Sequence, residues 1–176
     1  MTEAAKQLHD YVSNLISLLS LNSQEPPLPS VSKDTLLKEV GMYHRLFVPF
    51  NKIKLKHPFR GKLGHCYEYA FKASMRDANL IYCEGLATPG GLNFAIPLEH
   101  AWCVHAETGE VVDPVWKGKK TGLAYYGIPM SNAFVREVLL KNKVYGVMTH
   151  TLTLRFGDFK LGDIVHEYFH KNLFNK

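Results

Sequence analysis

Cys66, His100 and Asp113 have the side-chain types that nucleophilic catalysis requires, and they follow one another in that order along the chain. A cysteine attacks a carbonyl carbon as the thiolate, a histidine takes up the thiol proton and later returns it, and a carboxylate fixes the tautomer of the histidine. The three residues therefore predict a centre that forms a thioester with an acyl group. The alternative for Cys66 alone is a small buried apolar residue, which is the commoner fate of a free cysteine.

The sequence around Cys66 predicts that this thiol lies at the start of a helix. Gly64 is an acceptable N-cap, Glu68 falls in the first turn, and the chain from Tyr67 to Ala78 has neither glycine nor proline. Asn79 is expected to end the helix in a left-handed conformation. Unpaired N–H groups at a helix N-terminus favour negative charge, so this position lowers the pKa of a thiol.

His100 lies in a segment with strand character, residues 100 to 106, and Asp113 lies in another, residues 111 to 116. Side chains alternate along a strand, so His100, Trp102 and Val104 share one face. A base on one strand, a carboxylate on the next and a thiol on a helix packed against the sheet form the arrangement that this chemistry needs.

The turn between these two strands decides whether Asp113 reaches His100. A tight turn centred on Thr108 and Gly109 places Asp113 opposite Val104, roughly 13 Å along the strand from His100, which is too far for a hydrogen bond. A triad therefore requires a turn centred earlier or a bulge near Pro114. Without either, Cys66 and His100 would act as a dyad.

The helix-start Cys66, the segment His100-Ala101-Trp102 and the segment Val112-Asp113-Pro114-Val115-Trp116 resemble the transglutaminase-like branch of the papain-like cysteine enzymes. The closest likeness is to small transglutaminase-like proteins of bacteria and their phages, and it covers about residues 61 to 130. The resemblance implies thioester chemistry on an acyl donor: cleavage of an amide or isopeptide bond, deamidation of glutamine, or transfer of the acyl group to an amine. It implies no cofactor and no metal.

The resemblance also implies a role for each residue. Cys66 would be the nucleophile, His100 the general base and then the general acid, and Asp113 the orienting acid. The oxyanion would be held by the Cys66 backbone N–H and a second donor, for which Lys62 and His65 are the candidates. Two aromatic residues, Tyr67 and Trp102, would either shield the site or pack in the core.

The implied fold class is α+β, with a papain-like or transglutaminase-like core in which the helix that carries the cysteine packs on a small antiparallel β-sheet. At 176 residues the chain fits a single domain, residues 1–176. We expect a helical N-terminal extension over 1–45, the catalytic core over 61–130, and a helix-strand-helix over 131–176 that completes the domain.

Apolar periodicity and turn residues predict the other elements. The expected helices cover 4–21, a segment from Ser32, 131–143 and 161–173. The expected extended segments cover 46–60, 80–86, 124–128 and 144–156. A proline-containing connector is expected over 22–30, and a loop over 87–98 is expected either to wall a cleft or to serve as a simple connection.

Composition limits the partners. The net charge of +5 and the pI near 9.0 suggest an acidic partner or surface, although they also serve solubility. The only dense basic run comprises Lys52, Lys54, Lys56, Arg60 and Lys62. It lacks interleaved aromatic residues, so specific nucleic-acid binding is not expected. We expect a protein or peptide substrate, with a small amide as the alternative, and no membrane association.

Three cysteines cannot all pair within one chain, and the N-terminus does not have the pattern of a signal peptide. Free thiols and a cytoplasmic location are therefore expected.

Two other functions compete with the thiol hypothesis. The segment His166-Glu167-Tyr168-Phe169-His170 matches H-E-x-x-H, which on a helix places two imidazoles on one face for zinc with a glutamate base. Only six residues follow His170, so a third ligand downstream is not available, and surface histidines are the favoured interpretation. The second competing function is a non-catalytic binding protein that retains the fold.

Overall fold

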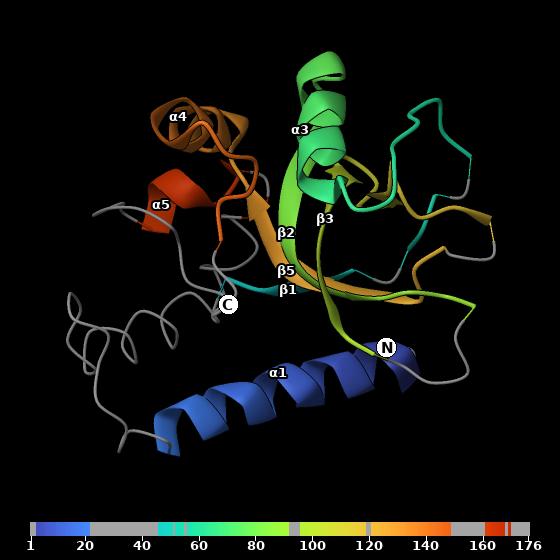
Figure 1. Cartoon of the computed structure of the whole chain (residues 1–176), viewed down its shortest axis with the longest axis vertical. Helices are drawn as coiled ribbons and strands as arrows, with labels where there is room; N and C mark the ends of the chain where they lie inside the picture. The colour runs from blue at the N-terminus through green and yellow to red at the C-terminus, as the bar shows by residue number, and fades with distance from the viewer. Residues whose placement is uncertain are drawn as a thin grey trace.

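The structure is a computed structural model that describes residues 3–21, 46–50, 52–54, 56–91, 96–118, 121–148, 161–167 and 169. The connector expected over 22–30 and the helix expected from Ser32 lie outside these ranges. The described part is an α+β fold with a curled five-stranded antiparallel sheet, as Figure 1 shows. None of its helices has the length and apolar character that crossing a membrane requires.

The sheet has the strand order β1-β5-β2-β3-β4. The strands are β1 (Val48–Phe50), β2 (Leu80–Thr88), β3 (Leu98–His105), β4 (Val111–Val112) and β5 (Ala124–Met130). The central strand β2 pairs with both β3 and β5, and every one of its residues is buried. Such continuous burial is what a strand covered on both faces requires.

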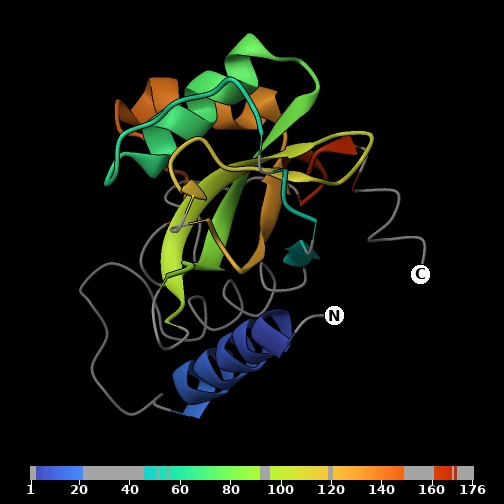
Figure 2. The same ribbon diagram turned by 90° about the vertical axis from the view of Figure 1, so that its right-hand side faces the viewer.

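Helices cover the sheet on two sides. The helix α3 (Cys66–Arg76) packs on β2 and β3, whereas α1 (Glu3–Leu21) crosses the opposite end of the molecule beside β5 (Figures 1 and 2). The helix α4 (Asn132–Asn142) follows β5, and the short α5 (Leu161–Ile164) lies below α4 in Figure 1. The helix expected over 4–21 and the strands expected over 80–86 and 124–128 are therefore present, each with slightly wider bounds.

Trp102 lies at the centre of the core and is fully buried against Phe50 and Tyr125, with ring centroids 6.1 Å and 5.1 Å away. Its indole has room because Gly127 has no side chain. A Cβ atom at Gly127 would lie 2.6 Å from Cη2 of Trp102 and 2.3 Å from the Glu84 carbonyl oxygen. Substitution of a buried ring of this size by alanine typically costs about 3–5 kcal/mol.

The helix expected over residues 67 to 78 ends earlier than predicted. It ends at Arg76, and Asp77 is extended at φ −131° and ψ 109°, so Asn79 is not the left-handed cap. The side chain of Asp77 accepts the Asn79 N–H at 3.0 Å, and this turn leads directly into β2.

The prediction of a strand over residues 111 to 116 was also too long. The strand β4 ends at Val112 because Asp113 closes a turn with its own carboxylate, which accepts the N–H groups of Val115 and Trp116. A side chain that binds these two N–H groups removes them from strand pairing.

Two predictions near the C-terminus were wrong within the described residues. Val144, Tyr145 and Val147 lie in bends, and only Met148 forms a β-bridge; the N–H groups of Val147 and Met148 donate to the Glu84 carboxylate. The helix expected over 161–173 is interrupted at Val165, which forms an antiparallel bridge with Met130.

Candidate active site

Cys66 is the first residue of α3 and is half-buried. The N-cap is His65 rather than Gly64, and its side chain makes no capping hydrogen bond. Gly64 precedes it with φ +81°, a conformation that side-chain-bearing residues rarely adopt, and the His65 N–H donates to the Lys62 carbonyl oxygen at 3.2 Å. The resulting tight turn brings the thiol to a helix N-terminus that no side chain caps.

The Cys66 thiol interacts with the His100 imidazole closely enough that each group shifts the pKa of the other. Burial raises the pKa of Cys66, but the interaction with His100, its charge and the backbone N–H groups of Ala101 and Tyr67 together outweigh burial. The net result is a Cys66 pKa below its ordinary value. The N–H of Tyr67 belongs to the first turn of α3, so the helix N-terminus contributes directly to this effect.

His100 is 2% exposed and connects the thiol to Asp113, whose Oδ2 atom lies 2.7 Å from Nε2 of His100. Since Nε2 faces the carboxylate, Nδ1 is the ring nitrogen left for the thiol. Burial lowers the pKa of His100, but hydrogen bonds to Asp113 and Cys66 and the charges of both groups raise it to about 9. Both shifts favour a thiolate beside an imidazolium.

The register of β3 and β4 explains how Asp113 reaches His100. Cys103 pairs with Val112 and Val104 with Val111, so the turn is centred one residue earlier than Thr108 and Gly109. This register places Asp113 level with Trp102, two residues from His100 rather than four. The chain then leaves the strand at Asp113, and the carboxylate turns toward the imidazole, so the earlier-turn alternative is the one the structure adopts.

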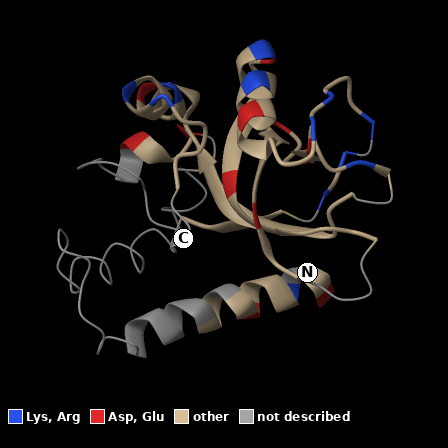
Figure 3. Ribbon diagram, viewed as in Figure 1, with Lys and Arg blue, Asp and Glu red and all other residues tan. Residues whose placement is uncertain are grey.

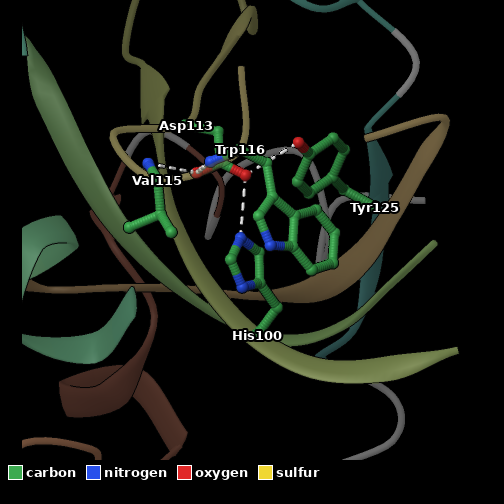
Figure 4. A network of polar contacts seen from close by, with 5 residues as sticks. All are labelled: His100, Asp113, Val115, Trp116 and Tyr125. Atoms are coloured by element: carbon green, nitrogen blue, oxygen red, sulfur yellow. Dashed lines mark hydrogen bonds and ion pairs between the residues drawn. The ribbon is translucent and has the colours of Figure 1, made fainter. Parts of the chain in front are cut away.

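Each oxygen of the Asp113 carboxylate accepts two hydrogen bonds (Figure 4). Oδ1 accepts the N–H groups of Val115 at 2.8 Å and Trp116 at 2.9 Å. Oδ2 accepts from His100 and from the Tyr125 hydroxyl at 2.9 Å. Burial raises the pKa of Asp113, whereas His100 and the two N–H groups lower it, and the net shift is downward. The carboxylate is thereby fixed in position and stays ionised.

Sequence reasoning gave no site role to Tyr125 and Trp116. Burial followed by the charge of Asp113 raises the pKa of the Tyr125 hydroxyl, against a smaller lowering by the Gly122 N–H, far enough to keep it a donor. Trp116 stacks on His100 with ring centroids 3.8 Å apart and planes 10° apart (Figure 4). An indole face favours a protonated imidazole. No sequence pattern distinguishes Tyr125 from Tyr126 as the residue that contacts Asp113. Trp116 does carry a signal, because it belongs to the motif around Asp113.

The candidate oxyanion donors Lys62 and His65 both lie in the turn before α3. The Lys62 side chain is exposed, and the contact that the structure gives this residue is made by its carbonyl oxygen. The His65 ring lies 3.2 Å from the Glu68 carboxylate and packs edge-on against Tyr69. The imidazole of His65 is thus directed along α3.

The two candidate shielding residues differ in position. Trp102 is fully buried on the same face of β3 as His100, and the two rings are nearly parallel at 6.3 Å. It therefore packs in the core and contacts the site from behind. Tyr67 is half-buried and faces Gly146, where a Cβ atom would lie 3.3 Å from its ring.

The H-E-x-x-H segment is described only in part, because Tyr168 and His170 lie outside the described residues. The His166 N–H donates to the Pro129 carbonyl oxygen, which ties this residue to the end of β5 rather than to a continuous helix. Within the described ranges, no group of three or more histidine, cysteine, aspartate or glutamate side chains is placed to hold a metal ion.

Comparisons of the chain with protein-family models, with curated proteins and with solved structures find no match.

Proposed function

We propose that this protein is a thiol-dependent hydrolase or acyltransferase that acts on an amide bond, an isopeptide bond or a glutamine carboxamide. The proposal is carried by one observation: Asp113 is hydrogen-bonded to His100, and His100 interacts with the Cys66 thiol at a helix N-terminus. The opposed pKa shifts of Cys66 and His100 supply a nucleophile and an acid near neutral pH.

In the first half of the proposed reaction, the Cys66 thiolate attacks the carbonyl carbon and forms a C–S bond. The Cys66 backbone N–H donates to the oxyanion that develops. As the C–N bond breaks, the electron pair leaves with the nitrogen, and the imidazolium of His100 protonates it. The products of this half are a thioester on Cys66 and a free amine or ammonia.

In the second half, His100 is neutral and acts as the general base. It takes a proton from water or from an acceptor amine, whose oxygen or nitrogen attacks the thioester carbon. The C–S bond breaks, and the sulfur leaves as the thiolate. Hydrolysis or deamidation results with water, and transamidation results with an amine. Asp113 holds the His100 ring through both halves because its hydrogen bond to Nε2 fixes the orientation of Nδ1.

The same observations support a papain-like, transglutaminase-like core. A cysteine at the start of α3, a histidine on β3 and a carboxylate directly after β4 follow the order and the secondary structure of that family. A protein or peptide is the proposed substrate, and a small amide is the alternative. The free thiols of Cys66, Cys83 and Cys103 fit the reducing cytoplasm that we propose as its location.

Competitive alkylation with iodoacetamide near neutral pH tests the nucleophile. Cys83 and Cys103 are fully buried and burial raises the pKa of both, so we expect Cys66 to react at least about ten times faster than either. Peptide mapping by mass spectrometry gives the three rates in one sample. Equal, slow labelling of the three cysteines would refute the proposal.

Thioester trapping tests the reaction. Incubation with a library of glutamine- and lysine-containing peptides should add an acyl mass to Cys66 that hydroxylamine removes, and Cys66→Ala should show no adduct. Cys103→Ala is the matched control because it removes a thiol from the core and leaves the site in place. A reactive Cys66 that never acquires an acyl group would instead favour the non-catalytic binding protein.

A further inference from the structure

A polar cavity of about 250 Å³ lies beside the candidate active site, between α3 and the segment before it. Its lining includes Phe59, Arg60, Tyr69, Lys72, Arg76 and Pro114. Three of these six residues are cations. The volume is below the range of roughly 300–1,000 Å³ that whole ligands usually occupy, so the cavity suits a single side chain rather than a large cofactor.

The cations of this cavity are only partly neutralised. Lys72 pairs with Glu68 and lies 5.6 Å above the Tyr69 ring. Neither Arg60 nor Arg76 has a carboxylate within ion-pair distance among the residues that the structure describes. Two guanidinium groups therefore remain available to an incoming anion, and guanidinium binds carboxylates through two parallel hydrogen bonds.

Further positive charge surrounds the cavity. Lysine and arginine residues gather on the segment between β1 and α3 and at the C-terminal end of α3, as Figure 3 shows. The Lys117 ammonium donates to the Phe59 carbonyl oxygen, and its pKa is lowered by burial and by the charge of Arg60. A cation that is held close to another cation marks a region of positive potential.

The cavity is lined by residues that are close in sequence to two residues of the candidate active site. Tyr69 lies one helical turn after Cys66, and Pro114 directly follows Asp113. The Gly61 N–H donates to the Pro114 carbonyl oxygen at 2.7 Å, so the segment that carries Arg60 is attached to the turn that carries the orienting carboxylate. A chain bound at Cys66 can therefore extend a neighbouring side chain to this cavity.

We propose that the cavity is a subsite for an acidic side chain of the polypeptide that Cys66 attacks, with Arg60 and Arg76 binding its carboxylate. This inference rests on the proposed function, because the bound polypeptide is a substrate only if Cys66 reacts with it. Binding at the subsite does not itself depend on turnover. The additional cations on the segment before α3 favour further acidic residues in the same polypeptide. The ligand class is thus an acidic peptide segment next to the reacting amide.

Fluorescence anisotropy with a fluorescein-labelled oligoglutamate peptide tests the subsite on the full chain. We expect binding to the unmodified protein and to Cys66→Ala, and a dissociation constant about ten-fold higher in Arg60→Gln/Arg76→Gln. Arg136→Gln is the matched control because this exposed arginine lies on α4, away from the cavity. A lysine pair, Arg60→Lys/Arg76→Lys, should bind more tightly than the glutamine pair because it retains the charge.

Three results would overturn the subsite. The first is equal weakening of binding by Arg136→Gln and by Arg60→Gln/Arg76→Gln. The second is an oligoglutamine peptide that binds as well as oligoglutamate, and the third is displacement of the peptide by an equal concentration of inorganic phosphate. Tighter binding of a single-stranded oligonucleotide of the same charge would assign the surface to nucleic acid instead. Peptide binding that persists without thioester formation would refute the proposed reaction and leave the subsite intact.

Discussion

Asp113 and Glu84 are buried to nearly the same extent, with 2% and 1% of their surface exposed. Each carboxylate accepts two backbone N–H groups and one tyrosine hydroxyl: Val115, Trp116 and Tyr125 for Asp113, and Val147, Met148 and Tyr82 for Glu84. Asp113 additionally holds His100, which contacts the thiol. The same set of hydrogen bonds therefore has two uses. Around Glu84 it fixes a segment of the chain, and around Asp113 it also orients the His100 base.

The largest expected effect comes from removal of either carboxylate. Asp113→Ala and Glu84→Ala should each lower the free energy of unfolding by roughly 3–5 kcal/mol, because each leaves buried N–H and O–H donors without an acceptor. Urea denaturation measures the loss. Glu137→Ala is the control, since it removes an exposed carboxylate that pairs with Lys141 and should cost less than about 0.5 kcal/mol. A loss below about 1 kcal/mol for either buried residue would contradict the shared anchoring role.

The second largest effect is on the pH dependence of the free energy of unfolding, which should distinguish Asp113 from Glu84 because only Asp113 holds His100. The pKa of His100 is raised from 6.5 to about 9, so the stability that this residue contributes is complete below about pH 6.5 and is lost as the pH rises through about 9. The loss should amount to at most roughly 3 kcal/mol. Asp113, whose pKa is lowered, contributes in the opposite direction, and its part is lost as the pH falls into the acid range below its unfolded value near 3.8.

Cys66 titrates with the sign opposite to that of His100, so the measurement uses the Cys66→Ala protein with and without His100→Gln. Urea midpoints near pH 6 and near pH 10 should differ more in Cys66→Ala than in the double variant. Glu84→Gln in the same background should retain the alkaline loss because His100 and Asp113 stay in place. The same loss in all three proteins would show that His100 is not its source.

Replacement of each carboxylate by its amide should then distinguish Asp113 from Glu84 by the effect on the reactivity of Cys66. Asp113→Asn replaces the acceptor of the His100 Nε2–H by a group that can present a donor, so we expect alkylation of Cys66 at pH 7 to slow by about ten-fold. The Glu84 carboxylate holds Val147 and Met148, which follow the Gly146 that faces Tyr67, so Glu84→Gln should change the rate less than about two-fold. Iodoacetamide kinetics give both numbers. Equal slowing in the two variants would remove the distinction between the carboxylates.

The smallest expected effect comes from the two tyrosine hydroxyls. Tyr125→Phe and Tyr82→Phe each remove one donor from a carboxylate and should cost about 1 kcal/mol of unfolding free energy. Tyr125→Phe should also move the alkaline limb of the stability profile, measured in the Cys66→Ala background, to higher pH, because Asp113 then interacts more strongly with His100 and raises its pKa further. Tyr82→Phe should leave this limb unchanged. A shift of the limb in Tyr82→Phe alone would reverse the assignment.

The sequence predicted which segments form strands and helices around the candidate site better than how those segments end. Alternation located β2, β3 and β5, and the absence of breakers located α3, because these patterns depend on local periodicity. The positions of their ends depended on side-chain hydrogen bonds, such as those that Asp77 and Asp113 make with backbone N–H groups. Composition and spacing do not encode which short polar side chain closes a turn.

The register between β3 and β4 could not be predicted from the sequence. The sequence indicated only that a triad requires an earlier turn or a bulge. Glu107 to Glu110 permits more than one turn, and a one-residue change in its centre moves Asp113 by two positions relative to His100. Glu84 was not anticipated at all, since a glutamate in a strand is ordinarily exposed. Its burial became visible only with the tertiary contacts of Val147 and Met148.

Because Cys83 and Cys103 lie in the interior, the reactivity of their thiols reports unfolding of the chain. Both thiols are fully buried in the central strands, and the Cys103 sulfur donates to the Ala70 carbonyl oxygen of α3 at 3.1 Å. A thiol-counting reagent should therefore detect one cysteine in the folded protein and three once β2 and β3 separate. Cys103 becomes reactive when α3 leaves the sheet, so the second thiol to appear would time the detachment of the helix that carries Cys66.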